Sequence, residues 1–285
     1  MNKAIKTILG TALGLIVASA GAHAGATFDR IKQTGVINIG FANEAPYSYR
    51  NPSGAMEGVV YEVGQIVLRK MGVKEFNGVI VQFGSLIPGL IANRYDIVVA
   101  GMAVRPERCA QIAFSEPDMR FGDTLLVPIG NPKGLNSFDD VIKTGAKIAV
   151  LQGGTSSKDV RRLGIPEAQI NEFPNFPETV GALRSKRVDA TVMTATTAAQ
   201  TVRADGSRSF EKVDKFVPPV FDGKPAVHFS AFGFRKEDSD LVEAFNKAFV
   251  EFRGSKEHID ILKKYALSEN ELPPPAVTTA SLCGS

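Results

Sequence analysis

The chain of 285 residues is long enough for one large domain or for two of ordinary size with hydrophobic cores. Hydrophobic residues make up 44% of it and charged residues 22%, which excludes a disordered or collagen-like chain. The formal net charge is +3, and it falls to +1 without Lys3 and Lys6, the only charged residues among the first 24. A chain so close to neutral, without a basic run, gives no reason to expect a nucleic-acid partner.

Residues 1–24 have the pattern of a secretory signal peptide. Lys3 and Lys6 precede an apolar run over residues 8–20, and Ala22-His23-Ala24 matches the small-x-small pattern of a cleavage site. The run is shorter than the roughly 20 apolar residues that span a bilayer, which favours a cleaved signal over an uncleaved anchor. We expect a mature chain that starts near Gly25, carries no lipid anchor, and acts outside the cytoplasm.

The first half of the chain alternates between strand and helix patterns. Strands are predicted over residues 36–41, 78–83 and 96–100, and helices over residues 59–71 and 86–94. This alternation favours an α/β fold with a largely parallel sheet.

The second half repeats this order. Strands are predicted over residues 147–151, around Ile170 and over 189–193, with a helix over 177–186. Three residues at the helix-to-strand junction also recur at a constant spacing, as Leu90, Arg94 and Asp96 and then Leu183, Arg187 and Asp189. We therefore predict two similar, Rossmann-like lobes.

The end of the chain departs from this repeat, because the extended segment 229–234 is followed by amphipathic helices. Cys109 and Cys283 predict one disulfide in an oxidising compartment, the alternative being two unrelated thiols. A disulfide would bring the tail back to the first lobe, with crossings near residues 126–131 and 227–231. The predicted organisation is lobe 1 over 25–127, lobe 2 over 128–229 and a return segment over 230–285, with a two-strand hinge and a cleft that can close.

Ligands of open α/β sheets bind outside the carboxyl ends of the strands. The loops at those ends are residues 43–49, 82–85, 101–108, 152–157 and 193–197, and they form the candidate site.

Two of these loops contain features that bind anions. Pro106 suits the first turn of a helix, which would place Arg108 near free N–H groups, where a carboxylate is bound well. The alternative is a surface arginine paired with Glu107 or Glu116. Gly153-Gly154-Thr155 opens a helix like an anion cradle, or it is an ordinary strand-to-helix turn, but no Lys-Ser/Thr follows to make it a P-loop.

A cation would find different side chains. Tyr47, Tyr49 and Phe83 lie in or near the cleft loops and would stack on an organic cation, although each could equally be a core residue. Glu44 supplies a negative charge, unless it is a solvated loop acid.

Catalytic patterns are missing. Of three histidines, His23 lies in the signal, His258 on a polar helix and His228 on a predicted crossing. The chain has no Gly-x-Ser-x-Gly motif, no Cys/His pair and no Cys/His cluster with metal-ligand spacing. We expect no metal, no cofactor and no enzymatic activity, although a hydrolase that uses carboxylates alone remains open.

Taken together, several segments resemble the family 3 solute-binding proteins of ABC importers for polar amino acids. These are the signal peptide, Asn43-Glu44-x-Pro46-Tyr47, residues 90–96, Gly101 to Arg108, and Gly153-Gly154-Thr155. Five stretches are most similar to the ectoine/hydroxyectoine-binding branch: Ala42-Asn43-Glu44-Ala45-Pro46-Tyr47, Leu86-Ile87-Pro88-Gly89-Leu90, Arg105-Pro106-Glu107-Arg108-Cys109, Gly130-Asn131-Pro132-x-Gly134-Leu135 and Gly153-Gly154-Thr155. The resemblance implies a type II periplasmic binding protein fold and a periplasmic monomer that delivers a zwitterion to an inner-membrane permease.

The resemblance also implies roles for individual residues. Arg108 and Thr155 would hold the ligand carboxylate, Glu44 would face the cation, and Tyr47 and Phe83 would form an aromatic cage. The full expected set is Glu44, Tyr47, Phe83, Gly101, Met102, Ala103, Arg108, Gly154, Thr155 and Thr194.

Two departures from the family pattern affect the choice of ligand. Thr194 stands where amino-acid binders place an aspartate for the ammonium, which favours a delocalised or alkylated cation. Ala103 stands where ectoine binders place an aromatic residue and amino-acid binders a hydroxyl. The alternative function is that of a secreted, cyclohexadienyl-dehydratase-like enzyme on the same fold.

Overall fold

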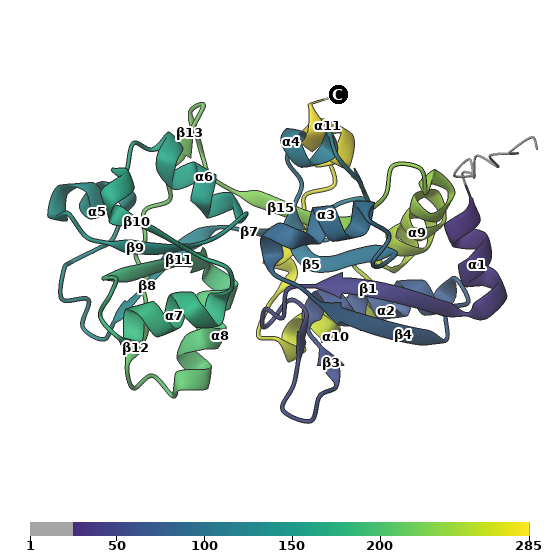
Figure 1. The fold of residues 1–285 in the computed structure, drawn as a ribbon, viewed down its shortest axis with the longest axis horizontal. Helices are drawn as coiled ribbons and strands as arrows, with labels where there is room; N and C mark the ends of the chain where they lie inside the picture. The colour runs from purple at the N-terminus through teal and green to yellow at the C-terminus, as the bar shows by residue number, and fades with distance from the viewer. Residues whose placement is uncertain (1–24, 285) are drawn as a thin grey trace, which may run out of the picture.

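The computed structural model describes residues 25–284, so the signal peptide predicted over residues 1–24 lies outside the described part. Two α/β lobes stand side by side, as predicted, and are joined by extended segments (Figure 1). Lobe 1 is built on a six-stranded sheet and lobe 2 on a five-stranded sheet. Within residues 25–284, no helix combines the length and the apolar composition needed to cross a bilayer.

Lobe 1 has the strand order β4-β1-β5-β15-β6, and β7 also pairs with β15. Parallel pairing joins β1 to β4 and β5, whereas β15 runs antiparallel to β5. The strands are β1 (Val36–Phe41), β4 (Glu75–Ile80), β5 (Ile97–Ala103), β6 (Ala113–Phe114), β7 (Met119–Phe121) and β15 (His228–Phe234), with a separate hairpin of β2 (Tyr49–Arg50) and β3 (Met56–Glu57). The helices are α1 (Ala26–Thr34), α2 (Val59–Lys70), η1 (Phe83–Ser85), α3 (Leu86–Ile91) and α4 (Pro106–Cys109).

One strand of lobe 1 is displaced from its predicted position. The segment expected over residues 78–83 pairs at Glu75–Ile80, because its register against β1 begins at Val36↔Glu75. Phe83 therefore begins the short helix η1 instead of ending a strand.

Lobe 2 has the strand order β10-β9-β11-β8-β12. Its strands are β8 (Asp123–Pro128), β9 (Ile148–Leu151), β10 (Ile170–Phe173), β11 (Ala190–Thr194) and β12 (Phe210–Lys212), and β13 (Val220–Phe221) pairs with β14 (Lys224–Pro225) in a hairpin. Its helices are α5 (Phe138–Thr144), α6 (Thr155–Arg162), η2 (Glu167–Gln169), α7 (Phe176–Arg184) and α8 (Ala195–Asp205).

Asp96 and Asp189, which recur at a constant spacing in the sequence, make equivalent hydrogen bonds in the two lobes. Asp96 accepts a hydrogen bond from the backbone N–H of Asn38 (2.9 Å), and Asp189 accepts one from the backbone N–H of Lys147 (2.8 Å). Each aspartate thus ties the start of one strand to the parallel strand beside it, β5 to β1 in lobe 1 and β11 to β9 in lobe 2. The recurrence of Leu90, Arg94 and Asp96 as Leu183, Arg187 and Asp189 therefore reflects the same β-α-β geometry in both lobes.

The chain passes from the sheet of lobe 1 to the sheet of lobe 2 earlier than the sequence predicts. β8 lies wholly in lobe 2, so the first crossing falls at Gly122, between β7 and β8, and not near residues 126–131 or at the expected boundary of 127/128. The second crossing leads into β15 at His228, close to the predicted segment 227–231. The apolar residues of β8 are buried like those of any internal strand. The sequence pattern therefore does not show to which of the two sheets β8 belongs.

The tail returns to lobe 1, as expected (Figure 1). It consists of α9 (Ser239–Phe252), α10 (Lys256–Lys264), η3 (Glu269–Glu271) and α11 (Thr279–Cys283). Phe245 and Phe249 of α9 pack in the core of lobe 1. The ring centroid of Phe245 lies 4.8 Å from that of Phe232 on β15. The predicted disulfide joins Cys109 to Cys283 with a Cα–Cα distance of 5.8 Å, so it fastens α11 to α4.

Candidate functional site

The loops at the carboxyl ends of the strands meet in a pocket between the lobes, with an empty volume of about 400 Å³. Nine of the ten residues expected in the site line it. Met102 does not, since it is fully buried in the core of lobe 1 between Gly101 and Ala103, whose positions face the other side of β5. The lining residues are Glu44, Tyr47, Phe83, Gly101, Ala103, Arg108, Phe121, Asp123, Leu151, Gly154, Thr155, Ser156, Phe176, Met193 and Thr194.

Arg108 lies in α4, with Pro106 in the first turn as predicted. Its side chain is buried and donates to the carbonyl oxygens of Ala103 (2.8 Å) and Gly153 (2.9 Å), so that it connects the two lobes. Burial lowers the pKa of Arg108 to about 10, with a smaller contribution from the charge of Arg105. A guanidinium carries five N–H donors, so these two bonds leave donors for an anion in the pocket.

Arg108 is not the surface arginine, paired with Glu107 or Glu116, that the sequence left as an alternative. Glu107 pairs instead with Lys158 of lobe 2 at 3.0 Å, and Glu116 accepts a hydrogen bond from the backbone of Thr279. Arg108 itself is buried, and its guanidinium carbon lies over the ring of Phe83, 5.5 Å from the ring centroid.

Lobe 2 contributes the start of α6 to the same pocket. Thr155 is the first residue of this helix, and Gly154 precedes it without a capping side chain. The N–H groups of a first helical turn have no partner within the helix, and the helix dipole makes this end attractive to an anion. Arg108 and the first turn of α6 therefore face one pocket from opposite lobes.

Glu44 comes from the loop that follows β1 and is almost fully buried. One of its oxygens accepts a hydrogen bond from the hydroxyl of Thr197 (2.7 Å), in the first turn of α8 in lobe 2. Burial raises the pKa of Glu44 to about 8, the Thr197 hydrogen bond opposes this shift, and the charge of Asp123 adds to it. Among residues 25–284, Glu44 is thus a buried carboxyl group that forms no ion pair.

Aromatic rings line the same pocket as this carboxyl group. Tyr47 donates its hydroxyl hydrogen to Thr194 Oγ1 (3.0 Å), a second contact between the lobes, and burial raises the pKa of Tyr47. Phe121 lies with its ring centroid 6.1 Å from that of Tyr47, and Phe176 lines the same pocket. Tyr49, by contrast, donates to Glu57 in the β2–β3 hairpin and does not line the pocket.

Four lining residues lie outside the loops expected to form the site: Phe121, Asp123, Leu151 and Phe176. The first two flank Gly122, the position where the chain leaves lobe 1. A crossing placed at residues 126–131 put both of them inside lobe 1 and away from the cleft. The sequence signal that could have revealed this position is the charged Asp123 ahead of the apolar run Leu125-Leu126-Val127.

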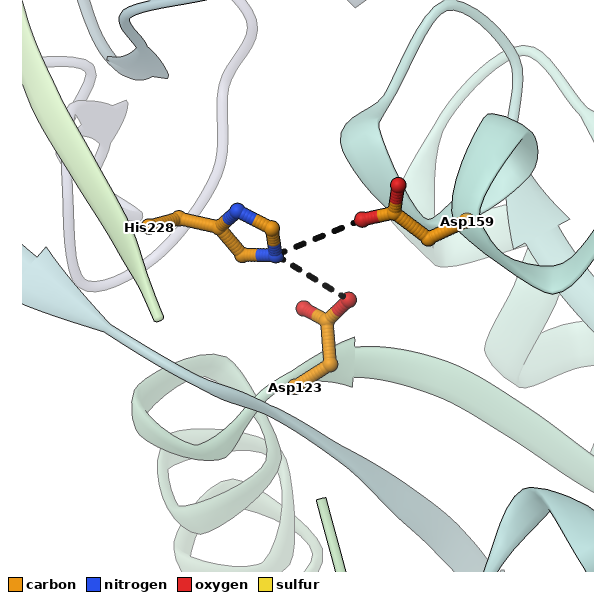
Figure 2. A group of neighbouring side chains, drawn as sticks. All are labelled: Asp123, Asp159 and His228. Atoms are coloured by element: carbon orange, nitrogen blue, oxygen red, sulfur yellow. Dashed lines mark ion pairs between the residues drawn. The ribbon is translucent and has the colours of Figure 1, made fainter. Parts of the chain in front are cut away.

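Asp123, Asp159 and His228 form a cluster beside the pocket (Figure 2). His228 Nε2 lies 3.5 Å from an oxygen of Asp159 and 3.9 Å from an oxygen of Asp123. One potential ligand atom from each residue lies within 4.8 Å of the others, which is close enough to share a metal ion. Arg105 of lobe 1, however, donates to both oxygens of Asp159 (2.7 and 2.8 Å), so this carboxylate already has a cation.

Comparisons with known proteins give a consistent result. The family described as bacterial extracellular solute-binding proteins, family 3, matches residues 37–268. A probable amino-acid ABC transporter periplasmic-binding protein of Sinorhizobium fredii is 39% identical over 262 residues, which cover 91% of this chain and 86% of that protein. The lysine/arginine/ornithine-binding periplasmic protein of Escherichia coli is 27% identical and covers 78% of this chain and 83% of its own length.

Among solved structures, EhuB in complex with hydroxyectoine superimposes with a TM-score of 0.81 at 27% identity, covering 92% of this chain and 98% of EhuB. The ancestral amino-acid-binding protein AncCDT-1, a precursor of cyclohexadienyl dehydratase, gives a TM-score of 0.74 at 26% identity. That match covers 84% of this chain and 99% of AncCDT-1.

Proposed function

Because the chain belongs to the bacterial extracellular solute-binding proteins of family 3 and has the type II periplasmic binding protein fold, we propose that it is the periplasmic component of an ABC transporter. In this role it binds a small zwitterion between its lobes and delivers it, as a monomer, to an inner-membrane permease. The observation that carries the proposal is a single pocket holding a buried guanidinium, Arg108, and a buried carboxyl group, Glu44, with aromatic rings between the lobes.

The anionic group of the ligand binds Arg108 and the first turn of α6, beginning at Thr155. A carboxylate accepts two parallel N–H bonds from a guanidinium and gains further from the helix dipole. The two groups come from different lobes, so both contact the ligand only when the cleft is closed.

The cationic group binds near Glu44, against the faces of Tyr47, Phe83 and Phe121. Aromatic faces attract organic cations, and the attraction is stronger when water is excluded. A cation also stabilises the charged form of Glu44, whose burial is otherwise unfavourable. Ectoine, hydroxyectoine and the polar amino acids all combine such a cation with a carboxylate, and the relatives named for amino acids and the hydroxyectoine complex of EhuB support this range.

Closure follows from contacts that exist only between the lobes. These include Arg108 with Gly153, Tyr47 with Thr194, and Glu44 with Thr197. A ligand that binds both lobes has a higher affinity for the closed state and shifts the population toward it.

Calorimetry with the mature protein tests the proposal. Ectoine, hydroxyectoine, glycine betaine, arginine, lysine, histidine and glutamine form the ligand panel, and we expect at least one to bind with one-to-one stoichiometry. Arg108→Ala should abolish that binding and leave the protein folded, whereas Arg94→Ala, on the surface of lobe 1, should leave it unchanged.

Two outcomes would contradict the proposal. One is retained affinity in the Arg108→Ala variant, which would mean that the carboxylate binds elsewhere. The other is turnover of arogenate or prephenate that Glu44→Gln abolishes, which would favour the dehydratase alternative.

A further inference from the structure

We propose that Asp123 is a second carboxylate for the ligand cation, and that together with Glu44 it selects a cation bearing N–H donors, such as a guanidinium, amidinium or ammonium group, over a fully alkylated nitrogen. The inference rests on the proposed function, since it concerns the same pocket.

The position of Asp123 follows from strand pairing. It is the first residue of β8, and its register partner on the antiparallel strand β11 is Thr194. Thr194 is the position where amino-acid binders of the family were expected to carry an aspartate. The neighbouring strand therefore supplies a carboxylate beside the position where the sequence pattern lacks one, and both residues line the pocket.

The carboxylate of Asp123 is poorly neutralised by the protein itself. Its side chain is 8% exposed, and no residue within 25–284 donates a hydrogen bond to it. The nearest cationic candidate, His228 Nε2, lies 3.9 Å away, beyond hydrogen-bonding distance, and is closer to Asp159. Arg105 directs its guanidinium to Asp159 as well.

The chemistry of the cation follows from what two buried carboxylates need. A buried carboxylate without donors is unfavourable, and hydrogen bonds from a charged donor are the strongest available to it. Glu44 has one donor, the Thr197 hydroxyl, and Asp123 has none within the described residues. An N–H cation can donate to both carboxylates, whereas a quaternary ammonium satisfies only the aromatic faces.

The first test needs no variant. Calorimetry compares arginine, lysine and ectoine, which carry N–H cations, with glycine betaine and Nε-trimethyllysine, which carry alkylated ones. The inference predicts that the best N–H ligand binds at least about tenfold more tightly than either alkylated ligand. Binding of an alkylated ligand that equals or exceeds that of every N–H ligand would overturn it.

The second test removes the charge of Asp123 with little change of shape. Asp123→Asn should weaken the best N–H ligand by at least about tenfold and narrow its advantage over the alkylated ligands. Asp214→Asn serves as the matched control, because the Asp214 side chain is 87% exposed and pairs only with Lys212 among the described residues.

Different results would contradict the proposed function and the role of Asp123. Absence of binding to every ligand by the wild-type protein contradicts the proposed function. Tight binding by the wild type that Asp123→Asn leaves within twofold contradicts the role of Asp123 alone. Thermal melting followed by circular dichroism shows whether Asp123→Asn is folded. If it is not, the comparison of N–H and alkylated ligands on the wild-type protein still tests the predicted selectivity.

Discussion

Gly153 of lobe 2 approaches Gly84 of lobe 1 so closely that a β-carbon on Gly153 would lie 2.7 Å from the Gly84 Cα atom. The clash would be with backbone, which cannot move aside as a flexible side chain can. Gly153 also has a φ of 74°, in the left-handed region that favours glycine. The two lobes therefore come together at this point only because Gly153 lacks a side chain, whereas a β-carbon on Gly84 would make ordinary contacts at 3.4 Å or more.

Gly153→Ala should weaken ligand binding strongly, because the added methyl group holds the lobes apart. Gly164→Ala is a matched control in lobe 2, with a φ of 81° and nothing within 4 Å of the added carbon. Both variants carry a backbone cost of about 1 kcal/mol, so their melting temperatures should fall alike. Calorimetry should show an affinity loss for Gly153→Ala alone, and equal affinities would refute the steric role of Gly153.

Arg105→Ala should destabilise the closed state. Arg105 neutralises Asp159, whose side chain is 7% exposed, and Asp123 lies in the same cluster. Removal of the guanidinium leaves like charges together in a buried place, at a cost of about 1–3 kcal/mol, or roughly 5- to 150-fold in affinity. Arg162→Ala, which breaks an exposed pair with Asp222, is the control.

Small-angle scattering adds a structural readout for Arg105→Ala. At a ligand concentration that saturates the wild type, the variant should keep a larger radius of gyration than the wild type. A variant that closes at the same ligand concentration as the wild type would show that this ion pair does not hold the lobes together.

Affinity should depend on pH through Glu44. Its pKa of about 8 in the ligand-free closed pocket means that the carboxyl group is protonated there at pH 6–7. A cationic ligand favours the carboxylate, so binding to the closed form at these pH values releases a proton, and the affinity of the closed form rises by up to about tenfold per pH unit before levelling off above pH 8. Calorimetry in buffers of different ionisation enthalpy, with a ligand that does not titrate in this range, measures the proton release. Glu44→Gln should remove it, and an unchanged release in that variant would assign the proton to another group.

The disulfide should stabilise the protein more than it affects the ligand. Cys109 and Cys283 are separated by 174 residues, and closing so long a loop in the unfolded chain contributes about 4–5 kcal/mol in the chain-entropy model. Replacing both cysteines by serine should lower the denaturation midpoint, and reduction of the wild type should do the same. A midpoint insensitive to both changes would show that α11 does not depend on this bond.

The local features of the fold could be predicted because they depend on short stretches of chain. The apolar alternation of β1 and the 3.6-residue period of α2 gave elements close to those observed. Pro106 placed Arg108 in a first turn, and the repeat of Asp96 at Asp189 indicated two similar lobes. Glu44, Tyr47 and Phe83 could be chosen because strand ends of parallel sheets meet at one edge.

The tertiary structure alone decided which residues from distant segments share the pocket. The sequence pattern left two gaps, a missing carboxylate at Thr194 and a missing aromatic residue at Ala103. Pairing of β8 with β11 brings Asp123 beside Thr194, and the crossing at Gly122 brings Phe121 beside Tyr47. Both placements follow from where the chain changes sheet, and a buried apolar strand has the same periodicity in either lobe. The strand-end topology and the family resemblance therefore indicated the Arg108 and Glu44 sides of the pocket, whereas long-range strand pairing determined which other residues line it.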